Sequence, residues 1–170
     1  IGDWKWTSAD TVRFLDDNNN PILDDFGNEI TATFDAEGVH VGDAAQTQVG
    51  FSVRYEPIPK AYIKLRRTYF DNYYSDFDPL SLNGDNAGRE SWKIPAYNLI
   101  DLHAGYKFKI LEKTKMDLKF SILNLFDEMY ISDAQNNDPY NASYQDFDAK
   151  SAGVFFGLGR RVNLSAKFTF

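Results

Sequence analysis

Two residues near the middle of the chain have the types and the spacing of a general-base pair. Asp101 and His103 lie two positions apart in a segment that alternates apolar and polar side chains, so both should point from the same face of a strand. A carboxylate beside an imidazole can orient the ring for proton transfer. No nucleophile with a matching motif accompanies the pair. We therefore expect a structural hydrogen-bond network here, with no catalytic residue and no enzyme activity.

A second group of polar residues has ligands suited to a hard cation. Asp16-Asp-Asn-Asn-Asn20 is followed closely by Asp24 and Asp25, but the spacing differs from that of an EF-hand calcium loop. His40 stands alone and is expected to be solvated. The chain contains no cysteine, which excludes disulfides and Cys-ligated metal sites. We expect neither a metal nor a cofactor, and the dispersed basic residues give no sign of nucleic-acid binding.

The elements that carry these residues have the pattern of strands. Apolar and polar side chains alternate along the end of the chain up to its last residue, Phe170. The segments 45–56, 60–75, 97–110 and 115–127 alternate in the same way, less cleanly in the second of them. A strand that is apolar on one side and polar on the other suits the wall of a membrane barrel around a wet lumen. A strand of a soluble sandwich can alternate as well, so the alternation alone does not decide between them.

The pattern predicts one antiparallel meander with two unlike faces. We expect strands at 3–15, 45–56, 60–75, 97–110, 115–127 and 158–170, and a short additional strand at 30–34. The residues expected to face lipid are Val49, Phe51, Val53, Ile100, Leu102, Leu118, Phe120, Leu164, Ala166 and Phe168. Those expected to face the lumen are Arg54, Lys64, Arg66, Asp101, His103, Lys107, Lys119 and Lys167. Arg67 interrupts the apolar face and should lie near a membrane interface, where a charge costs little.

The connections between these strands alternate in length. Two are tight turns, Pro57-Ile58-Pro59 and Leu111-Glu-Lys-Thr114. The other three, at 16–44, 76–96 and 128–157, are longer than the roughly 12 to 15 residues that are usual in a compact soluble domain. Short periplasmic turns and long extracellular loops are typical of an outer-membrane barrel.

Charge divides along the same line. The three long loops hold 17 acidic residues (8, 4 and 5) and only 3 basic ones, whereas the strands and turns hold 8 acidic and 15 basic residues. The formal net charge of −7 therefore combines acidic loops with a basic wall. Loop charge also favours solubility, so simple solvation of the loops remains open.

Composition excludes a helical membrane protein. The mean hydropathy is −0.47, and no run approaches the roughly 18 apolar residues that a spanning helix needs. The aromatic content is nevertheless 16%. The cluster of Tyr69, Phe70, Tyr73, Tyr74 and Phe77 is expected at a membrane interface, with a cross-strand cluster in a soluble core as the alternative. The start, Ile1-Gly-Asp-Trp-Lys-Trp6, has no signal peptide, and we expect that earlier segments of the protein precede it.

Several motifs have a recognisable order near the end of the chain. Asn124-Leu-Phe-Asp127 is followed by Met129-Tyr130, a polar loop, Gly159-Arg160 and a terminal strand that ends in Phe170. Together these features resemble the C-terminal end of TonB-dependent outer-membrane receptors. The preceding strands resemble the same family through Tyr55-Glu-Pro57, Asp71-Asn-Tyr-Tyr-Ser-Asp-Phe77 and Ser91-Trp-Lys-Ile-Pro-Ala-Tyr97. The resemblance covers nearly the whole chain and is weakest across 16–44.

The resemblance implies a barrel of about 22 strands that is filled by an N-terminal plug. This chain would supply about six of those strands, so we expect it to be the C-terminal part, residues 1–170 forming one barrel portion. The implied function is active uptake of a scarce nutrient, such as a siderophore, haem, a corrinoid or an oligomeric substrate, across the outer membrane of a Gram-negative bacterium. The implied partners are outer-membrane lipid, a small external ligand and the periplasmic energy-transducing TonB protein, which would bind a TonB box in an N-terminal region absent from this chain.

The last strand has a further implied role. A terminal aromatic with apolar residues at alternate positions before it, here Phe168 and Phe170, resembles the signal that the outer-membrane assembly machinery reads. The alternative is that Phe170 is one more interfacial aromatic. Two other functions remain open at this point, a passive porin with the same strand signature and a soluble β-rich binding module. The sequence leaves the transported substrate undetermined.

Overall fold

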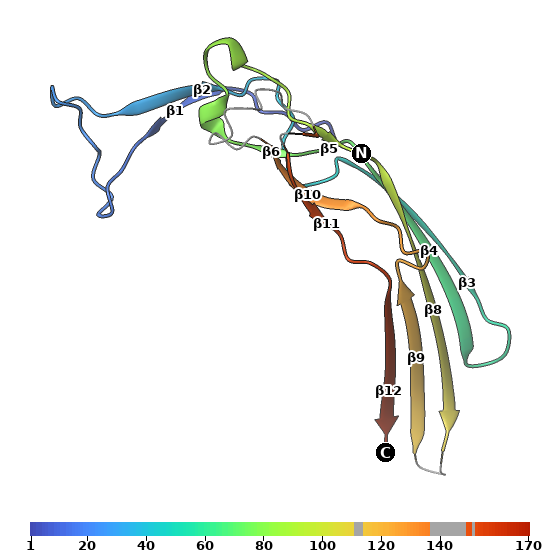
Figure 1. The fold of residues 1–170 in the computed structure, drawn as a ribbon. Helices are drawn as coiled ribbons and strands as arrows, with labels where there is room; N and C mark the ends of the chain where they lie inside the picture. Colours follow the sequence, from blue (N-terminus) through green and yellow to red (C-terminus); the bar gives the residue numbers. More distant parts are fainter. Residues whose placement is uncertain (111–113, 137–148, 151) are drawn as a thin grey trace.

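The computed structural model describes residues 1–110, 114–136, 149–150 and 152–170. Five strands form its main sheet. They are β3 (Thr47–Tyr55), β4 (Ala61–Asp71), β8 (Tyr97–Lys109), β9 (Lys115–Leu123) and β12 (Arg161–Thr169). Their spatial order is β12-β9-β8-β4-β3, and every neighbouring pair is antiparallel. In Figure 1 they form one long, curved sheet, with the β3–β4 turn and the C-terminus at one end and the described parts of the long loops at the other.

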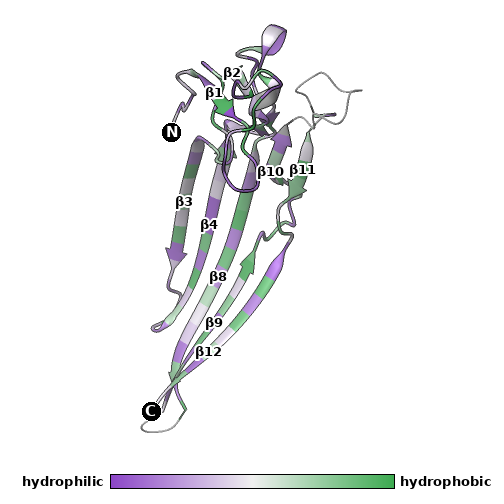
Figure 2. Cartoon of the chain, turned by 90° about the vertical axis from the view of Figure 1, so that its left-hand side faces the viewer, coloured by the Kyte–Doolittle hydropathy of each residue, from purple (hydrophilic) through white to green (hydrophobic). Residues whose placement is uncertain are grey.

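The register of the sheet separates apolar from polar side chains. One row of directly paired residues crosses all five strands with apolar side chains only, namely Val53, Leu65, Leu102, Ile122 and Val162. The next row crosses them with polar side chains only, namely Arg54, Lys64, His103, Ser121 and Asn163. Because side chains alternate along each strand, these rows belong to opposite faces, which we call the apolar face and the polar face. Figure 2 shows the corresponding bands of hydrophobic and hydrophilic residues along the strands.

The segment 3–15 does not join this sheet, so the prediction of a wall strand there is wrong. Its ordered part, β1 (Ala9–Arg13), pairs instead with β2 (Thr31–Asp35), which confirms the short strand predicted near 30–34. The chain between the two strands folds back on itself, which brings their ends together. Figure 1 shows this β1–β2 unit as an arm that projects away from the main sheet.

The other long loops are ordered over the residues that the structure describes. They contain β5 (Tyr73–Tyr74), β6 (Asp76–Phe77), β7 (Lys93–Ile94), β10 (Ile131–Asn136) and β11 (Gly153–Phe156), and the 3₁₀ turns η1 (Pro79–Ser81) and η2 (Gly84–Asn86). β10 pairs with β11 antiparallel and with β6 in parallel, and β5 pairs with β7. The turn predicted at 111–114 lies outside the described residues except for Thr114. No helix in the described parts of the chain is long and apolar enough to cross a membrane.

The buried residues lie at the loop end of the molecule. One cluster consists of Phe34, Ala36, Val39, Phe77 and Leu82, and a second of Ala45, Tyr73, Ile94 and Ala134. Tyr73 is only 6% exposed, and its hydroxyl donates to the backbone oxygen of Ser132. The expectation that Tyr73 and Phe77 belong to an interfacial aromatic cluster is therefore wrong. Both side chains are buried, each in a cluster formed by residues from different loops.

Candidate functional site

The polar face of the main sheet gathers all eight residues that the sequence pattern assigned to one side. They are Arg54, Lys64, Arg66, Asp101, His103, Lys107, Lys119 and Lys167, and the pairing of adjacent strands places them in neighbouring rows. The ten residues assigned to the other side share the apolar face by the same register. The sequence therefore predicted which residues share a face, although no closed lumen is present in the open sheet.

Asp101 and His103 do not pair with each other. The Asp101 carboxylate accepts from Arg66 at 3.0 Å (Nε) and 2.6 Å (Nη2) and from the backbone N–H of Asn124 at 3.0 Å. The His103 ring nitrogen Nδ1 lies 2.9 Å from the hydroxyl of Ser121 on the neighbouring strand. Both residues take cross-strand partners, because side chains directly opposite each other are closer than side chains two positions apart on one strand.

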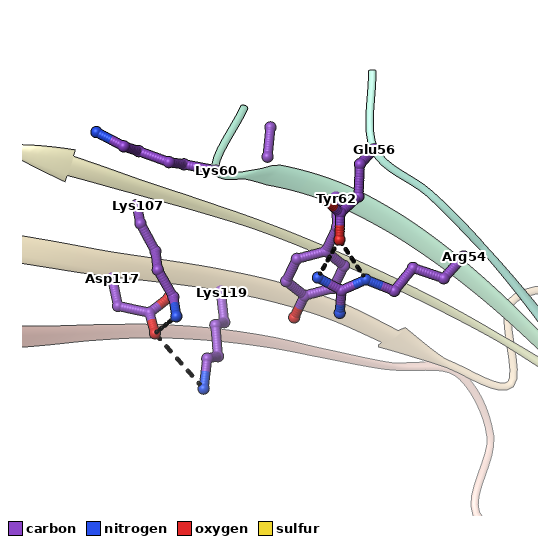
Figure 3. A pocket seen from close by; sticks show the side chains of 8 residues that line it. Arg54, Glu56, Lys60, Tyr62, Lys107, Asp117 and Lys119 are labelled. Carbon is purple, nitrogen blue, oxygen red and sulfur yellow. Dashed lines mark hydrogen bonds and ion pairs between the residues drawn. The ribbon is translucent and has the colours of Figure 1, made fainter. Parts of the chain in front are cut away.

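A pocket of about 280 Å³ lies on the polar face near the tight turn between β3 and β4. Its lining, shown in Figure 3, is Arg54, Glu56, Lys60, Ala61, Tyr62, Lys107, Asp117 and Lys119. Arg54 is held on one side of it, since its Nε donates to Glu56 at 2.9 Å and its guanidinium lies 4.0 Å from the centre of the Tyr62 ring. A guanidinium over an aromatic ring is attracted by the ring's negative face, which fixes the wall of the pocket.

Tyr62 can lie in this position because the residue opposite it on β8 is a glycine. A Cβ on residue 105 would overlap the Tyr62 ring. The ring therefore covers the bare backbone of Gly105 and forms the apolar floor beside the charged groups. The alternating pattern marked this glycine only as a position on the polar face.

The opposite side of the pocket holds two lysines around one carboxylate. The Nζ atoms of Lys107 and Lys119 lie 4.0 Å and 3.8 Å from the same Asp117 oxygen, Oδ2. The other oxygen, Oδ1, is buried and has no hydrogen-bond partner among the described residues. Both lysines are more than half exposed. Asp117 thus attracts both ammonium groups electrostatically but accepts a hydrogen bond from neither, because both distances are too long.

The Asn124-Leu-Phe-Asp127 motif ties the end of β9 to the start of β12. The Asn124 side chain accepts from the backbone N–H of Glu128 at 2.9 Å and donates to the backbone oxygens of Glu128 and Leu158 at 2.9 and 3.3 Å. Asp127 accepts from the backbone N–H of Arg160 at 2.7 Å. Asn124 and Asp127 both have positive φ, 52° and 58°, a conformation that Asn and Asp tolerate better than other non-glycine residues. The sequence analysis singled out these residues only because the motif resembles a family, and the structure shows that their side chains position the backbone.

His40 is not solvated as expected. Its Nδ1 lies 2.6 Å from Glu90 and its Nε2 lies 3.1 Å from Asp3, and the ring stacks on Tyr74 with centroids 4.0 Å apart. The three partners come from segments far apart in sequence, so only the fold reveals the contact. In the described part of the chain, no three His, Asp or Glu side chains are grouped so as to hold a metal ion.

The acidic segment of the arm consists of two similar hairpins. The sequence Phe14-Leu-Asp-Asp-Asn-Asn-Asn-Pro21 is followed by Ile22-Leu-Asp-Asp-Phe-Gly-Asn-Glu29, an eight-residue repeat that the sequence interpretation missed. In the first hairpin, Asp16 accepts from the backbone N–H groups of Asn18 and Asn20, and Asp24 accepts equivalently in the second. Backbone N–H donation, chiefly from Asn20 and Asn28, lowers the pKa of Asp16 and of Asp24 below 3.8. These carboxylates are therefore used to close the hairpins.

A ring of backbone hydrogen bonds joins the two hairpins. Ile22 N–H donates to Phe14, Ile30 N–H donates to Ile22, and Phe14 N–H donates to Ile30, at 2.9, 2.8 and 3.1 Å. The two hairpins are held by these bonds rather than by burial, since Phe26 at the tip of the second hairpin is 90% exposed, whereas Phe34 on β2 is buried.

The two residues assigned to an assembly signal lie at the free edge of the main sheet. β12 has β9 on one side and no strand on the other among the described residues. Phe168 shares the apolar face with Met116, its partner on β9, and Phe170 is 94% exposed just beyond the strand. The unpaired edge and the exposed aromatic are both available to another surface.

Comparison with known proteins adds no identification. No family model matches the chain, and no curated protein matches it significantly.

Proposed function

We propose that the chain is the C-terminal wall of a TonB-dependent receptor in the outer membrane of a Gram-negative bacterium, which takes up a scarce nutrient. The observation that carries the proposal is the continuous five-strand separation of an apolar from a polar face. The strands of the main sheet are 9 to 13 residues long, close to the roughly 9 to 11 residues that a tilted strand needs to cross a bilayer.

The exposure of the apolar face supports lipid as its neighbour. Val53 on β3 is 60% exposed and Leu164 on β12 is 71% exposed, and on the inner strand β4 Leu65 is 41% exposed. In a soluble sandwich this face would be covered by a second sheet, because a sandwich buries its inner faces against each other. Two charged residues of β4 lie on this face. Asp71 is at the loop end of the strand, and Arg67 has its guanidinium held by the Asn98 oxygen at 3.0 and 2.7 Å, so its charge is hydrogen-bonded.

The two ends of the sheet support a direction in the membrane. The β3–β4 turn lies at one end, and the described parts of the three loop regions, whose sequences hold most of the acidic residues, lie at the other (Figure 1). By the usual arrangement of such barrels, the turn end faces the periplasm and the loop end faces the outside. The free edges of β3 and β12 would then be paired with other strands of the same barrel, because unpaired edges are not stable in lipid.

A receptor is favoured over a porin by the resemblance of Asn124-Leu-Phe-Asp127 and the terminal strand to the receptor family. In such a receptor a small external ligand binds at the loop end, and the TonB protein supplies energy through an N-terminal region. The wall described here contributes strands, loops and the terminal strand that the assembly machinery reads.

Cysteine labelling of the full-length protein in isolated outer membranes tests the placement of the faces. This chain has no natural cysteine, so each single variant adds one labelled position to it, and the unsubstituted protein gives the background. Val53→Cys should react with a lipid-soluble maleimide and resist a charged one, whereas Ser52→Cys should react with the charged reagent when the barrel is permeable. Leu164→Cys and Asn163→Cys form a second matched pair. Equal reactivity within both pairs would contradict a lipid-facing wall.

Uptake separates the receptor from a porin. Accumulation of the nutrient at low external concentration should stop when the TonB protein is deleted from the cell. Accumulation that continues without TonB would favour a passive porin.

A further inference from the structure

The lower half of the polar face, from the row of His103 to the tight turns, carries a large excess of positive charge. Its cations are Arg54, Lys60, Lys64, Lys107, Lys109, Lys115, Lys119 and Lys167. Among the described residues, the carboxylates of this region are Asp117 and, on the turn, Glu56. A surface with one sign of charge and few counter-charges concentrates ions of the opposite sign.

The pocket in this region has cations that its own carboxylates do not neutralise. Glu56 is occupied by Arg54, with Nη2 at 2.8 Å. Asp117 is shared by Lys107 and Lys119, and both distances exceed hydrogen-bonding range. Each ammonium group has three N–H donors, so most of these donors remain available to a ligand.

Lys60 on the pocket rim occupies a position that favours a different residue. Its φ is +72°, in the left-handed region that glycine adopts without strain. Of the two carboxylates that line the pocket, Glu56 pairs with Arg54 and Asp117 with Lys107 and Lys119, and neither pairs with Lys60. A lysine held in an unfavourable conformation beside a cationic pocket gains nothing in folding from its charge, which is consistent with a role in binding.

We propose that this pocket binds a small oxyanion with two negative charges, such as a phosphate or a dicarboxylate, between Lys107 and Lys119, with Lys60 at the rim. Asp117 positions the two lysines, and the Tyr62 ring beside them gives an apolar surface for the rest of a larger solute. The proposed occupant is a solute, because the pocket opens on the polar face and the lipid-facing side chains lie on the other side of the sheet; in the proposed receptor this face turns toward the plug, so the solute would lie between the wall and the plug. Only this choice of a solute over a lipid phosphate depends on the proposed function.

Inorganic phosphate is the probe for this site. The full-length protein in a phosphate-free detergent is titrated with phosphate at constant ionic strength, and binding is followed by broadening of the ³¹P resonance. We expect saturable broadening that Lys107→Gln and Lys119→Gln each weaken at least tenfold. Succinate should compete, and chloride at the same ionic strength should not. The control is Lys64→Gln, a cation on the same face outside the pocket lining, which should stay within twofold of the parent.

Lys60→Gly separates binding from folding. Glycine suits the positive φ, so this variant should unfold no more easily than the parent while its affinity for phosphate falls two- to fivefold. The site is overturned if the parent shows no saturable broadening, or if Lys64→Gln weakens binding as much as Lys119→Gln does.

Repeating the titration in nanodiscs with anionic lipids tests the source of the anion. If phosphate binding is lost only in the nanodiscs, a lipid phosphate occupies the pocket, and the choice of a free solute as its occupant is overturned. Dependence of uptake on TonB is a separate measurement, so the two proposals fail independently.

Discussion

The backbone N–H of Asn124 donates to the side chain of Asp101 at 3.0 Å, although 23 residues separate the two positions. Through this bond the Asn124-Leu-Phe-Asp127 turn is fixed to the middle of β8. The same carboxylate also holds Arg66 on β4, so one buried acid connects two strands and the turn that leads toward β12.

Replacing Asp101 should therefore loosen the turn. Asp101→Ala leaves the Asn124 amide without its acceptor and should cost about 1 to 3 kcal/mol of unfolding free energy. Arg66 is half-exposed and can be solvated, so it adds little to this cost. Urea unfolding in lipid vesicles measures the effect. Asp101→Asn keeps an oxygen for the amide and should lose less, and an equal loss in both variants would show that the amide contact is unimportant.

The contact between Tyr62 and Gly105 predicts a destabilisation with a specific rescue. Gly105→Ala places a methyl group in the Tyr62 ring and should cost about 1 to 3 kcal/mol. In the background Tyr62→Ala the same substitution should be nearly neutral, which gives a coupling energy on the order of 1 kcal/mol or more in a double-mutant cycle. If the effects of the two substitutions on the free energy of unfolding simply add, the Tyr62 ring does not pack on residue 105.

The two faces predict unequal penalties for a charge in mid-strand. Leu164→Arg should cost about 2 to 4 kcal/mol if the apolar face meets the bilayer, whereas its neighbour Ser165→Arg should cost much less. Phe120→Arg and Ser121→Arg on β9 repeat the comparison. Similar penalties on both faces, measured by unfolding in vesicles, would mean that the apolar face does not contact lipid.

The end of the chain predicts an effect on assembly. Deleting Phe170 should lower the amount of folded receptor in the outer membrane more than Phe168→Leu does, because the leucine keeps the apolar face intact. A gel shift that distinguishes folded from unfolded barrels provides the measurement. If the two variants fold to the same level, Phe170 acts only as an interfacial aromatic.

The arm predicts a pH dependence. The pKa values of Asp16 and Asp24 are lowered in the folded arm, so the stabilisation they give is present above the unfolded value of 3.8 and is lost as pH falls through the lower folded values. Pepsin digestion should therefore leave the arm intact at about pH 4.5 and cut it near exposed Phe26 well below pH 3.8. The double variant Asp16→Ala and Asp24→Ala, which removes the side-chain acceptors of both hairpins, should be cut at both pH values. A parent arm cut equally at both would show that these carboxylates do not close the hairpins.

The alternation of apolar and polar residues predicted much of the sheet. It indicates a strand, and it also limits the register, because a shift by one residue would move every apolar side chain to the polar face. Val53, Leu102 and Leu164 were assigned to one face from sequence and share it in the structure. The same pattern gave a wrong result at 3–15, because it does not show which strand will be the neighbour. The two hairpins of the arm bring β2 beside β1, so this segment pairs outside the main sheet.

The sequence predicted some residues of the candidate site, among them Arg54, Lys107 and Lys119, but none of its contacts. Lys107 and Lys119 were placed on the polar face, but the sequence did not show that both would surround Asp117. His40 was misjudged for the same reason, since Asp3 and Glu90 reach it only through folding of the loops. Tyr73 and Phe77 have the composition of interfacial aromatics, and only their packing shows that they are core residues.

The ring of hydrogen bonds among Phe14, Ile22 and Ile30 limits how the arm can change in length. Each hairpin leaves the ring and returns to it after eight residues, so one whole hairpin can be removed while β1 and β2 still meet in register. A deletion of four residues would instead bring a hairpin tip to the ring and leave its backbone groups unpaired. The arm should therefore vary among relatives in steps of a whole repeat, which makes it a part of the surface that evolution can lengthen or shorten without disturbing the wall.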